Sequence, residues 1–186
     1  SYTVSKFGDL KMGGHYPAKY PNFGRRSQYI QTANGVDQIV TNSDDRIQKF
    51  SGYKQWDLTQ KILLKSSDKL THSFNVQLSN STDIPRYDRL QDKKNFGGSI
   101  GTTLRYAEWY YGPQLRLLSA YQAQWSPTAN REVSLQVHYQ HVLESRQTRE
   151  YLRYDRFDSR REKLNVWGFN LDTRTKQKNN EFTYGI

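Results

Sequence analysis

The chain has 186 residues, a formal net charge of +10 and no cysteine. Only 34% of its residues are apolar, too few for a large core, yet 14% are aromatic, which is unusual for a disordered chain. The composition therefore excludes a disordered basic tail, a disulfide scaffold and thiol chemistry. It leaves basic nucleic-acid-binding domains, and β-structures whose strands have one wet face.

The first quarter of the chain is predicted to hold one strand and one small hairpin. Residues 1–11 form the expected first strand, and a long connection follows over residues 13–49. Within this connection, residues 28–41 carry Asn34 and Gly35 at their centre. An Asn-Gly pair is typical of a two-residue hairpin turn, so a hairpin is expected here.

Two runs with a period of two come next. In residues 54–64 apolar and polar side chains alternate, and residues 70–79 repeat the pattern after the polar segment 66–69. Alternation over this length is typical of a strand with one apolar and one wet face. The short connection predicts that the two strands pair antiparallel.

Two more hairpins are predicted in the second half. One joins residues 105–125 to residues 133–140 through a turn at 126–130, and the other joins 160–175 to 182–186 through a turn at 176–179. Long connections over 84–104 and 150–160 separate these hairpins. Helix-period stripes and helix caps are not convincing anywhere in the sequence.

Short turns therefore alternate with long loops along the chain. Short turns at one end and long loops at the other are typical of an outer-membrane barrel. The sequence predicts an all-β fold: an antiparallel up-and-down transmembrane barrel segment with about seven strands, short periplasmic turns and long extracellular loops. Bacterial single-chain barrels have an even number of strands and must close. Seven strands, the last cut short, predict that residues 1–186 are a partial barrel domain.

Each predicted strand has one face for lipid and one for a watery lumen. The residues expected to face the lumen are Gln55, Asp57, Thr59, Asn75, Gln77, Gln136 and His138. The residues expected to face lipid are Trp56, Leu58, Phe74, Val76, Leu115, Leu117, Leu135 and Val137. Aromatic residues near the strand ends are expected to form the girdles found at membrane interfaces, and these are Trp56, Trp109, Tyr111, Tyr121 and Trp125.

Arginine and aromatic residues gather where the second long connection leaves and rejoins the strands. Arg86, Tyr87 and Arg89 follow one strand, and Trp109 and Tyr110 stand where the loop returns. Such side chains are common anchors of recognition, so they are candidates for a ligand-binding rim on the extracellular side. An aromatic girdle with loop-packing residues is the alternative reading of the same cluster.

The sequence predicts no metal site, no cofactor and no catalytic centre. His138 and His141 are three residues apart, which places them on opposite faces of a strand. A glycine-rich phosphate loop and a Gly-x-Ser-x-Gly elbow are both missing from the sequence. The chain is therefore not expected to be an enzyme.

The basic excess has two readings. A cluster near residue 156 interleaves basic and aromatic side chains: Tyr151, Arg153, Tyr154, Arg156, Phe157, Arg160, Arg161 and Lys163. In a soluble protein this pattern is typical of binding to single-stranded nucleic acid or another polyanion. In a barrel the same residues would neutralise lipopolysaccharide phosphates or fill the lumen. The nearby acids and the lack of a nucleic-acid-binding motif favour the barrel, with no nucleic acid as partner.

Four segments carry a resemblance to a known family: residues 5–13 (SKFGDLKMG), 51–58 (SGYKQWDL), 79–90 (SNSTDIPRYDRL) and 104–114 (LRYAEWYYGPQ). These segments, and the strand and loop texture of the whole chain, are similar to the barrel region of TonB-dependent outer-membrane receptors of the Bacteroidetes type. The resemblance implies a 22-stranded barrel, plugged by an N-terminal domain, in the bacterial outer membrane.

The resemblance also implies a function and partners. The family imports a scarce nutrient, such as an iron chelate, haem, cobalamin or a glycan. Its energy comes from the TonB complex, which acts through a plug domain. Outer-membrane lipid and lipopolysaccharide are expected partners, and a surface lipoprotein is a candidate partner. The chain departs from the family pattern because it shows no plug domain, no TonB box and no closing strand with a terminal aromatic.

Overall fold

The structure is a computed structural model that describes residues 1–14, 20 and 23–186. Residues 15–19 and 21–22 of the first long connection lie outside the described residues. The described residues form β-strands and no α-helix, with a single 3-10 turn, η1 (Arg89–Gln91). None of the described residues belongs to a helix long and apolar enough to cross a membrane.

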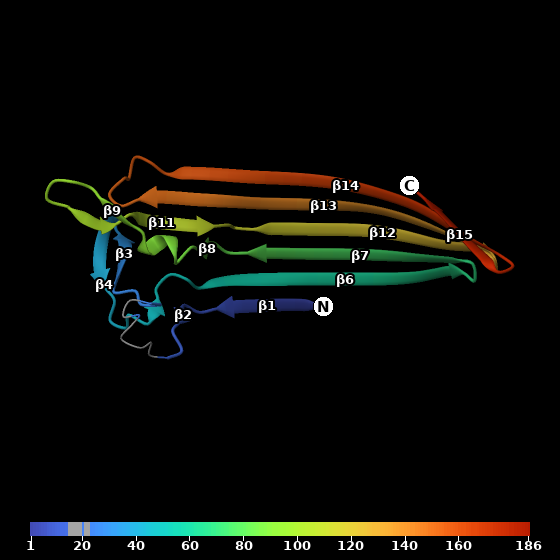
Figure 1. The fold of residues 1–186 in the computed structure, drawn as a ribbon, viewed down its shortest axis with the longest axis horizontal. Helices are drawn as coiled ribbons and strands as arrows, with labels where there is room; N and C mark the ends of the chain where they lie inside the picture. The colour runs from blue at the N-terminus through green and yellow to red at the C-terminus, as the bar shows by residue number, and fades with distance from the viewer. Residues whose placement is uncertain (15–19, 21–22) are drawn as a thin grey trace.

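One large antiparallel sheet dominates the molecule, and its long strands lie side by side in chain order (Figure 1). The expected antiparallel all-β fold is confirmed. The strands that follow one another across the sheet are β1 (Tyr2–Phe7), β6 (Tyr53–Ser67), β7 (Leu70–Ser81), β12 (Leu115–Thr128), β13 (Arg131–Glu150), β14 (Asp158–Gln177) and β15 (Asn180–Gly185).

Two short strands extend this sheet at one end. β11 (Tyr106–Tyr111) pairs with the last third of β13, and β8 (Ile84–Pro85) pairs with β11. They continue the paths of β12 and β7, so the sheet has seven strand paths. In the described chain β1 and β15 each pair on one side only, and the sheet is therefore open.

The three predicted hairpins have their turns at the same end of the sheet, on the right of Figure 1. These turns are residues 68–69, 129–130 and 178–179. The predicted turn at 126–130 is shorter than expected, because β12 continues to Thr128 after a register shift that follows Trp125. The long connections all return at the opposite end, which we call the loop end.

The connections at the loop end contain structure of their own. Residues 28–41 form the predicted hairpin of β3 (Gln28–Ala33) and β4 (Val36–Thr41), with Asn34 and Gly35 both at positive φ. Positive φ at both central residues is what the twist of a tight hairpin requires. The second connection folds into a hairpin of β9 (Lys93–Asn95) and β10 (Thr102–Leu104).

The predicted first strand, 1–11, is broken in the structure. β1 ends at Phe7, and β2 (Leu10–Lys11) pairs instead with β5 (Ile47–Gln48). The side chain of Asp9 explains the break, since its Oδ1 accepts hydrogen bonds from the amides of Ser51 (2.9 Å) and Gly52 (3.0 Å).

The predicted single strand over 105–125 is also interrupted, at Gly112–Gln114. Tyr111 pairs with Arg146 and Leu115 pairs with Leu143, so four steps along one strand match three along the other. A slip of one residue moves side chains to the other face of a sheet. Trp109 and Tyr111, two of the expected girdle aromatics, therefore lie on the opposite face of the sheet from Tyr121 and Trp125.

The described core is small and lies at the loop end. The buried apolar side chains are Ile30, Leu90, Leu104 and Trp109, and all four belong to connections or to β11. The long strands instead expose large apolar groups, such as Trp167 at 73% and Phe169 at 55%. Over the long strands, no second layer of described residues covers the sheet.

Gly112 provides the first testable prediction. It has φ +110°, and a Cβ placed there would lie 3.0 Å from the carbonyl oxygen of Thr82. Because both the conformation and the space favour glycine, we expect Gly112→Ala to lower the free energy of unfolding by about 1–3 kcal/mol. Urea denaturation followed by circular dichroism measures this loss.

The matched control is Gly8→Ala, where a Cβ would meet no atom within 4 Å and φ is not positive. This variant should unfold within about 0.5 kcal/mol of the parent chain. Equal losses for Gly8→Ala and Gly112→Ala would contradict the special role of Gly112.

Candidate functional site: two sheet faces and a basic pocket

The cross-strand register sorts the long strands into two faces. Leu58 pairs with Leu78, which pairs with Leu117. Phe74 pairs with Tyr121, which pairs with Val137. All residues expected to face lipid occupy this face, which we call the apolar face: Trp56, Leu58, Phe74, Val76, Leu115, Leu117, Leu135 and Val137.

The residues expected to face the lumen lie on the other side, the polar face. Thr59 pairs with Gln77, and Gln136 pairs with Gln122. The full set is Gln55, Asp57, Thr59, Asn75, Gln77, Gln136 and His138. The register therefore keeps the two expected sets on opposite faces. That one face meets lipid and the other water stays a prediction.

Polar side chains on the apolar face bind one another. His72 Nδ1 lies 2.8 Å from the hydroxyl of Tyr121. Tyr139 donates a hydrogen bond of 2.8 Å to Asn165 Oδ1, which also lies 2.7 Å from His141 Nδ1. Polar groups that leave water cost free energy unless they are hydrogen-bonded, so this pairing suits a face removed from water.

His138 and His141 lie on opposite faces, as their spacing predicts. His138 pairs with Ala120 on the polar face, whereas His141 pairs with Leu117 on the apolar face. Among the described residues no three His, Asp or Glu side chains form a group that could hold a metal ion.

A cluster around Trp109 builds the polar face at the loop end. The ring of Trp109 stacks edge-on against Tyr111 and lies under the guanidinium of Arg86, 5.1 Å from the ring centroid. Arg86 is fixed by two hydrogen bonds to Asp88 (2.8 and 2.7 Å) and by one to the Tyr111 hydroxyl (2.8 Å). Arg146 approaches Trp109 at 6.0 Å. Trp109 is only 8% exposed, so it supports the arginines and offers little surface itself.

The structure places the five predicted rim residues in different surroundings. Arg86, Arg89 and Trp109 gather on the polar side of the loop end. Tyr87 lies in the turn before η1 with 39% of its surface exposed. Tyr110 pairs with Gln147, on the same side of β13 as the apolar face, and so points away from the cluster. Binding of a ligand by these residues stays a prediction.

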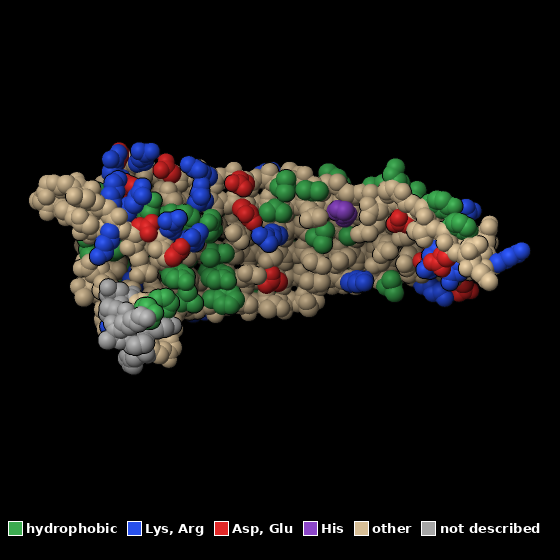
Figure 2. All heavy atoms as spheres, viewed as in Figure 1, with side chains coloured by type: hydrophobic (Ala, Val, Ile, Leu, Met, Phe, Trp, Pro, Cys, Tyr) green, Lys and Arg blue, Asp and Glu red, His purple; other side chains and the backbone are tan. Residues whose placement is uncertain are grey.

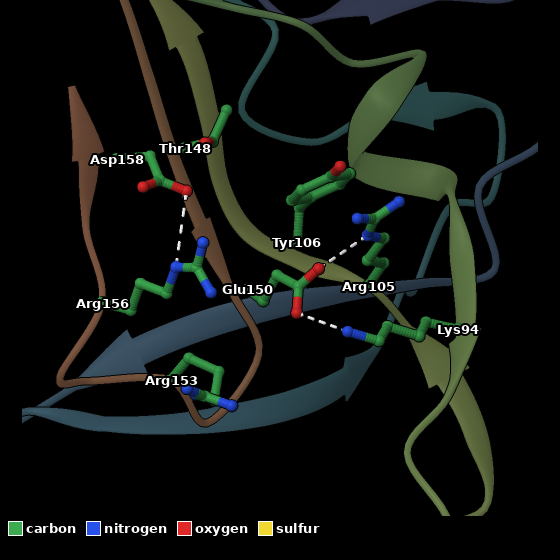
Figure 3. Close-up of a pocket in the computed structure, with 8 residues that line it drawn as sticks. All are labelled: Lys94, Arg105, Tyr106, Thr148, Glu150, Arg153, Arg156 and Asp158. Atoms are coloured by element: carbon green, nitrogen blue, oxygen red, sulfur yellow. Dashed lines mark hydrogen bonds and ion pairs between the residues drawn. The ribbon is translucent and has the colours of Figure 1, made fainter. Parts of the chain in front are cut away.

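Two adjoining cavities of about 290 Å³ each open beside this cluster. They share Tyr106, Thr148 and Asp158 in their walls. The inner cavity is also lined by Arg89, Trp109, Arg146 and Arg160. The outer cavity, drawn in Figure 3, is also lined by Lys94, Arg105, Glu150, Arg153 and Arg156. Figure 2 shows the corresponding crowding of blue basic side chains at the loop end.

Most cations of the outer cavity have carboxylate partners. Glu150 accepts hydrogen bonds from Lys94 (2.6 Å) and Arg105 (2.8 Å), as Figure 3 shows. The hydrogen bond from Lys94, followed by that from Arg105, outweighs burial and lowers the pKa of Glu150. Arg156 lies 3.8 Å from Asp158. The outer cavity is therefore a nearly compensated ion network.

The inner cavity differs because two of its cations are uncompensated. Arg146 and Arg160 are cross-strand partners on β13 and β14, and neither forms an ion pair with a described carboxylate. The sequence places Arg146 among lumenal or loop ion pairs, and it does not predict Arg146, Tyr106 or Thr148 as binding residues. The available signal was the change from apolar to basic side chains beyond the apolar part of the strands.

A buried ion pair holds the β3–β4 hairpin against the sheet. Arg149 binds Asp37 through two hydrogen bonds of 2.8 and 2.9 Å, and their side chains are 7% and 0% exposed. Asp37 also accepts hydrogen bonds from the hydroxyl of Thr32 (2.7 Å) and the amide of Leu152 (2.9 Å). Glu108 binds the other side of Arg149 at 2.7 Å. Sequence reasoning missed this clasp, whose two central residues are 112 positions apart.

Comparisons with protein-family models, with curated proteins and with solved structures found no match to this chain.

The clasp should open in acid. Burial alone would raise the pKa of Asp37, but hydrogen bonds from Arg149, Thr32 and Leu152 outweigh it and lower the pKa below the ordinary 3.8. A lowered carboxyl pKa stabilises the folded form above the ordinary value and loses that effect as the pH falls through the lowered value. We therefore expect the hairpin to undock as the pH falls below the ordinary value of 3.8 and through the lowered pKa of Asp37. Pulsed EPR distances between labels at Gln31→Cys and Ser159→Cys measure the docking.

The Asp37→Asn variant should undock the hairpin at pH 7, because removing one charge of a buried pair costs about 3–5 kcal/mol. The control is Asp155→Asn, which removes a carboxylate from an exposed pair with Arg153. A narrow, unchanged distance distribution for Asp37→Asn at pH 7 would disprove the role of the clasp.

Proposed function

We propose that the chain is part of the wall of an outer-membrane β-barrel transporter of the TonB-dependent type. The observation that carries this proposal is the uncovered apolar face of the long strands. Trp167, Phe169 and Leu171 on β14 are 73%, 55% and 39% exposed. Burying such a side chain is worth about 1.5–3 kcal/mol, so a whole face of them needs a non-aqueous neighbour.

The size of the apolar face fits a bilayer. On β13 it runs from Val133 to Leu143, and the residues that flank it on the same face are Arg131 on one side and Ser145 on the other. Eleven residues at about 3.3 Å, tilted by about 40°, span about 25 Å. This height equals that of the apolar band of outer-membrane barrels. Trp56 and Trp125 lie near opposite borders of the face, where interfacial aromatics belong.

The connections agree with this orientation. Turns of two residues join the strands at one end, whereas connections with their own hairpins join them at the other (Figure 1). In the proposed barrel the turns face the periplasm and the loop end faces outward. The free edges of β1 and β15 accept further strands, and closure into 22 strands belongs to this proposal.

The alternative, a soluble basic domain that binds nucleic acid or another polyanion, is weakened by the register. Arg160 pairs with Arg146 on the polar side, whereas Arg161 and Lys163 pair with Ser145 and Leu143 on the apolar side. The cluster that looks continuous in the sequence is therefore divided between two faces. A single-stranded nucleic acid needs one continuous basic groove.

The same division assigns two tasks to the basic residues in the proposed barrel. Arg161 and Lys163 lie at the loop-end border of the apolar face, where lipopolysaccharide phosphates would be in reach. Arg160 faces the pathway inside the wall. Import of a nutrient, coupling to the TonB complex and contact with a surface lipoprotein rest on the family resemblance and complete the proposal.

The absence of cysteine allows a direct test of the apolar face, since one introduced cysteine can be spin-labelled without background. We expect labels at positions 133 to 139 of β13, in lipid vesicles, to alternate in accessibility. Leu135→Cys and Val137→Cys should be reached by oxygen dissolved in the bilayer. Their neighbours Gln136→Cys and His138→Cys should be reached by a water-soluble nickel chelate.

The matched pairs differ by one residue on one strand, so each is the control for the other. A chain that stays monomeric in buffer without detergent, with both faces reached equally by the nickel chelate, would refute the membrane assignment.

A further inference from the structure

We propose that the inner cavity is a binding site for a small oxyanion ligand, held by Arg146 and Arg160 through carboxylate or phosphate groups. As a site on a transport pathway it rests on the proposed function. The binding itself rests only on the geometry of the loop end.

The two arginines of the inner cavity repel each other. Arg146 and Arg160 are directly opposite each other on β13 and β14. Like charges in this position destabilise a strand pair. Neither guanidinium has a carboxylate within ion-pair distance among the described residues, and Arg160 forms no hydrogen bond with them either. An anion between the two arginines would remove the repulsion.

The nearest carboxylates do not take this role. Glu144 and Glu162 form the next cross-strand pair on the same face. Glu144 is engaged by Arg116 at 2.8 Å, and neither glutamate forms an ion pair with Arg146 or Arg160. The strands therefore hold two arginines beside two glutamates without joining them, which leaves the arginine donors open to a ligand.

Arg146 is held in position before any ligand binds. Its guanidinium lies against the ring of Trp109, and the other cation on that ring, Arg86, is fixed by Asp88. Stacking holds a guanidinium in place without using its N–H groups. The five donors of Arg146 thus remain available for bidentate hydrogen bonds to a carboxylate or phosphate.

The size and surroundings of the cavity define the ligand. The inner cavity has a volume of about 290 Å³, which is at the lower limit for small-molecule sites. It therefore has room for one acidic group of the ligand and a compact body attached to that group. Tyr106 and Thr148 line both this cavity and the outer cavity. In the outer cavity the ion pair between Arg156 and Asp158 is long, at 3.8 Å, so Arg156 can bind a second acidic group of the ligand. The expected ligand therefore carries at least two carboxylate or phosphate groups.

The inner cavity lies on the polar side of the sheet, so the ligand proposed for it is not lipopolysaccharide. Headgroup phosphates lie outside a barrel wall and reach Arg161 and Lys163 on the apolar side of β14. The inner cavity opens on the other side of the same strand. A ligand bound there is a molecule inside the wall.

The test compares two neighbouring arginines of β14 that lie on opposite faces. The purified chain in detergent micelles is titrated with citrate and, separately, with pyrophosphate, by calorimetry and Trp fluorescence. Arg160→Gln should weaken binding of the preferred probe at least tenfold, whereas Arg161→Gln removes the same charge and should change it less than twofold. The preference between citrate and pyrophosphate tells carboxylate from phosphate as the natural group.

Several results would overturn the proposal. These are the absence of binding for both probes, equal losses for Arg160→Gln and Arg161→Gln, and tighter binding of an oligothymidylate than of either probe. The Arg160 side chain forms no hydrogen bond or ion pair with the described residues, so Arg160→Gln carries the test even where Arg146→Gln disturbs the stack on Trp109. The spin-label pattern on β13 tests the membrane assignment separately. The membrane assignment can therefore fail while oxyanion binding holds, and oxyanion binding can fail while the membrane assignment holds.

Discussion

A sheet with one apolar face must place that face against something other than water, and the rest of this structure depends on that constraint. The long strands carry aromatic and aliphatic side chains in register, but the described chain supplies no second layer to cover them. In a soluble β-sandwich this face would be the core. Among the described residues, the buried apolar side chains lie at the loop end, so they supply no core to the long strands. The proposed place in a lipid bilayer would satisfy the constraint with this one layer of strands.

The strands extend beyond the apolar face, and the excess builds the loop end. β13 and β14 each have 20 residues, and the apolar face extends over about half of that length. The remaining residues carry the clasp between Asp37 and Arg149 and the walls of both cavities. The candidate site is therefore set on extended, hydrogen-bonded strands, with hairpins packed around them. Such a site is more rigid than one formed by loops alone.

Much of the fold could be predicted from the sequence, because period two is a local signal. The hairpins of β6 with β7 and of β14 with β15 follow from alternation and polar turns, and the hairpin of β3 with β4 follows from Asn34 and Gly35. The clasp could not be predicted, since it depends on contacts between residues 112 positions apart. The break after Phe7 likewise depends on amides that bind Asp9 from 42 residues away. Local patterns do not report such contacts.

A shift of one residue in the pairing with β13 changes the face on which Trp109 lies. Alternation alone assigns Trp109 to the same face as Leu115 and Trp125, because all three have odd numbers. The interruption at Gly112 shifts the pairing with β13 by one residue and turns Trp109 to the polar side. There its ring meets Arg86 and Arg146. The cationic cavity on the polar face therefore requires this irregular segment, since an unbroken strand would leave the arginines without their aromatic support.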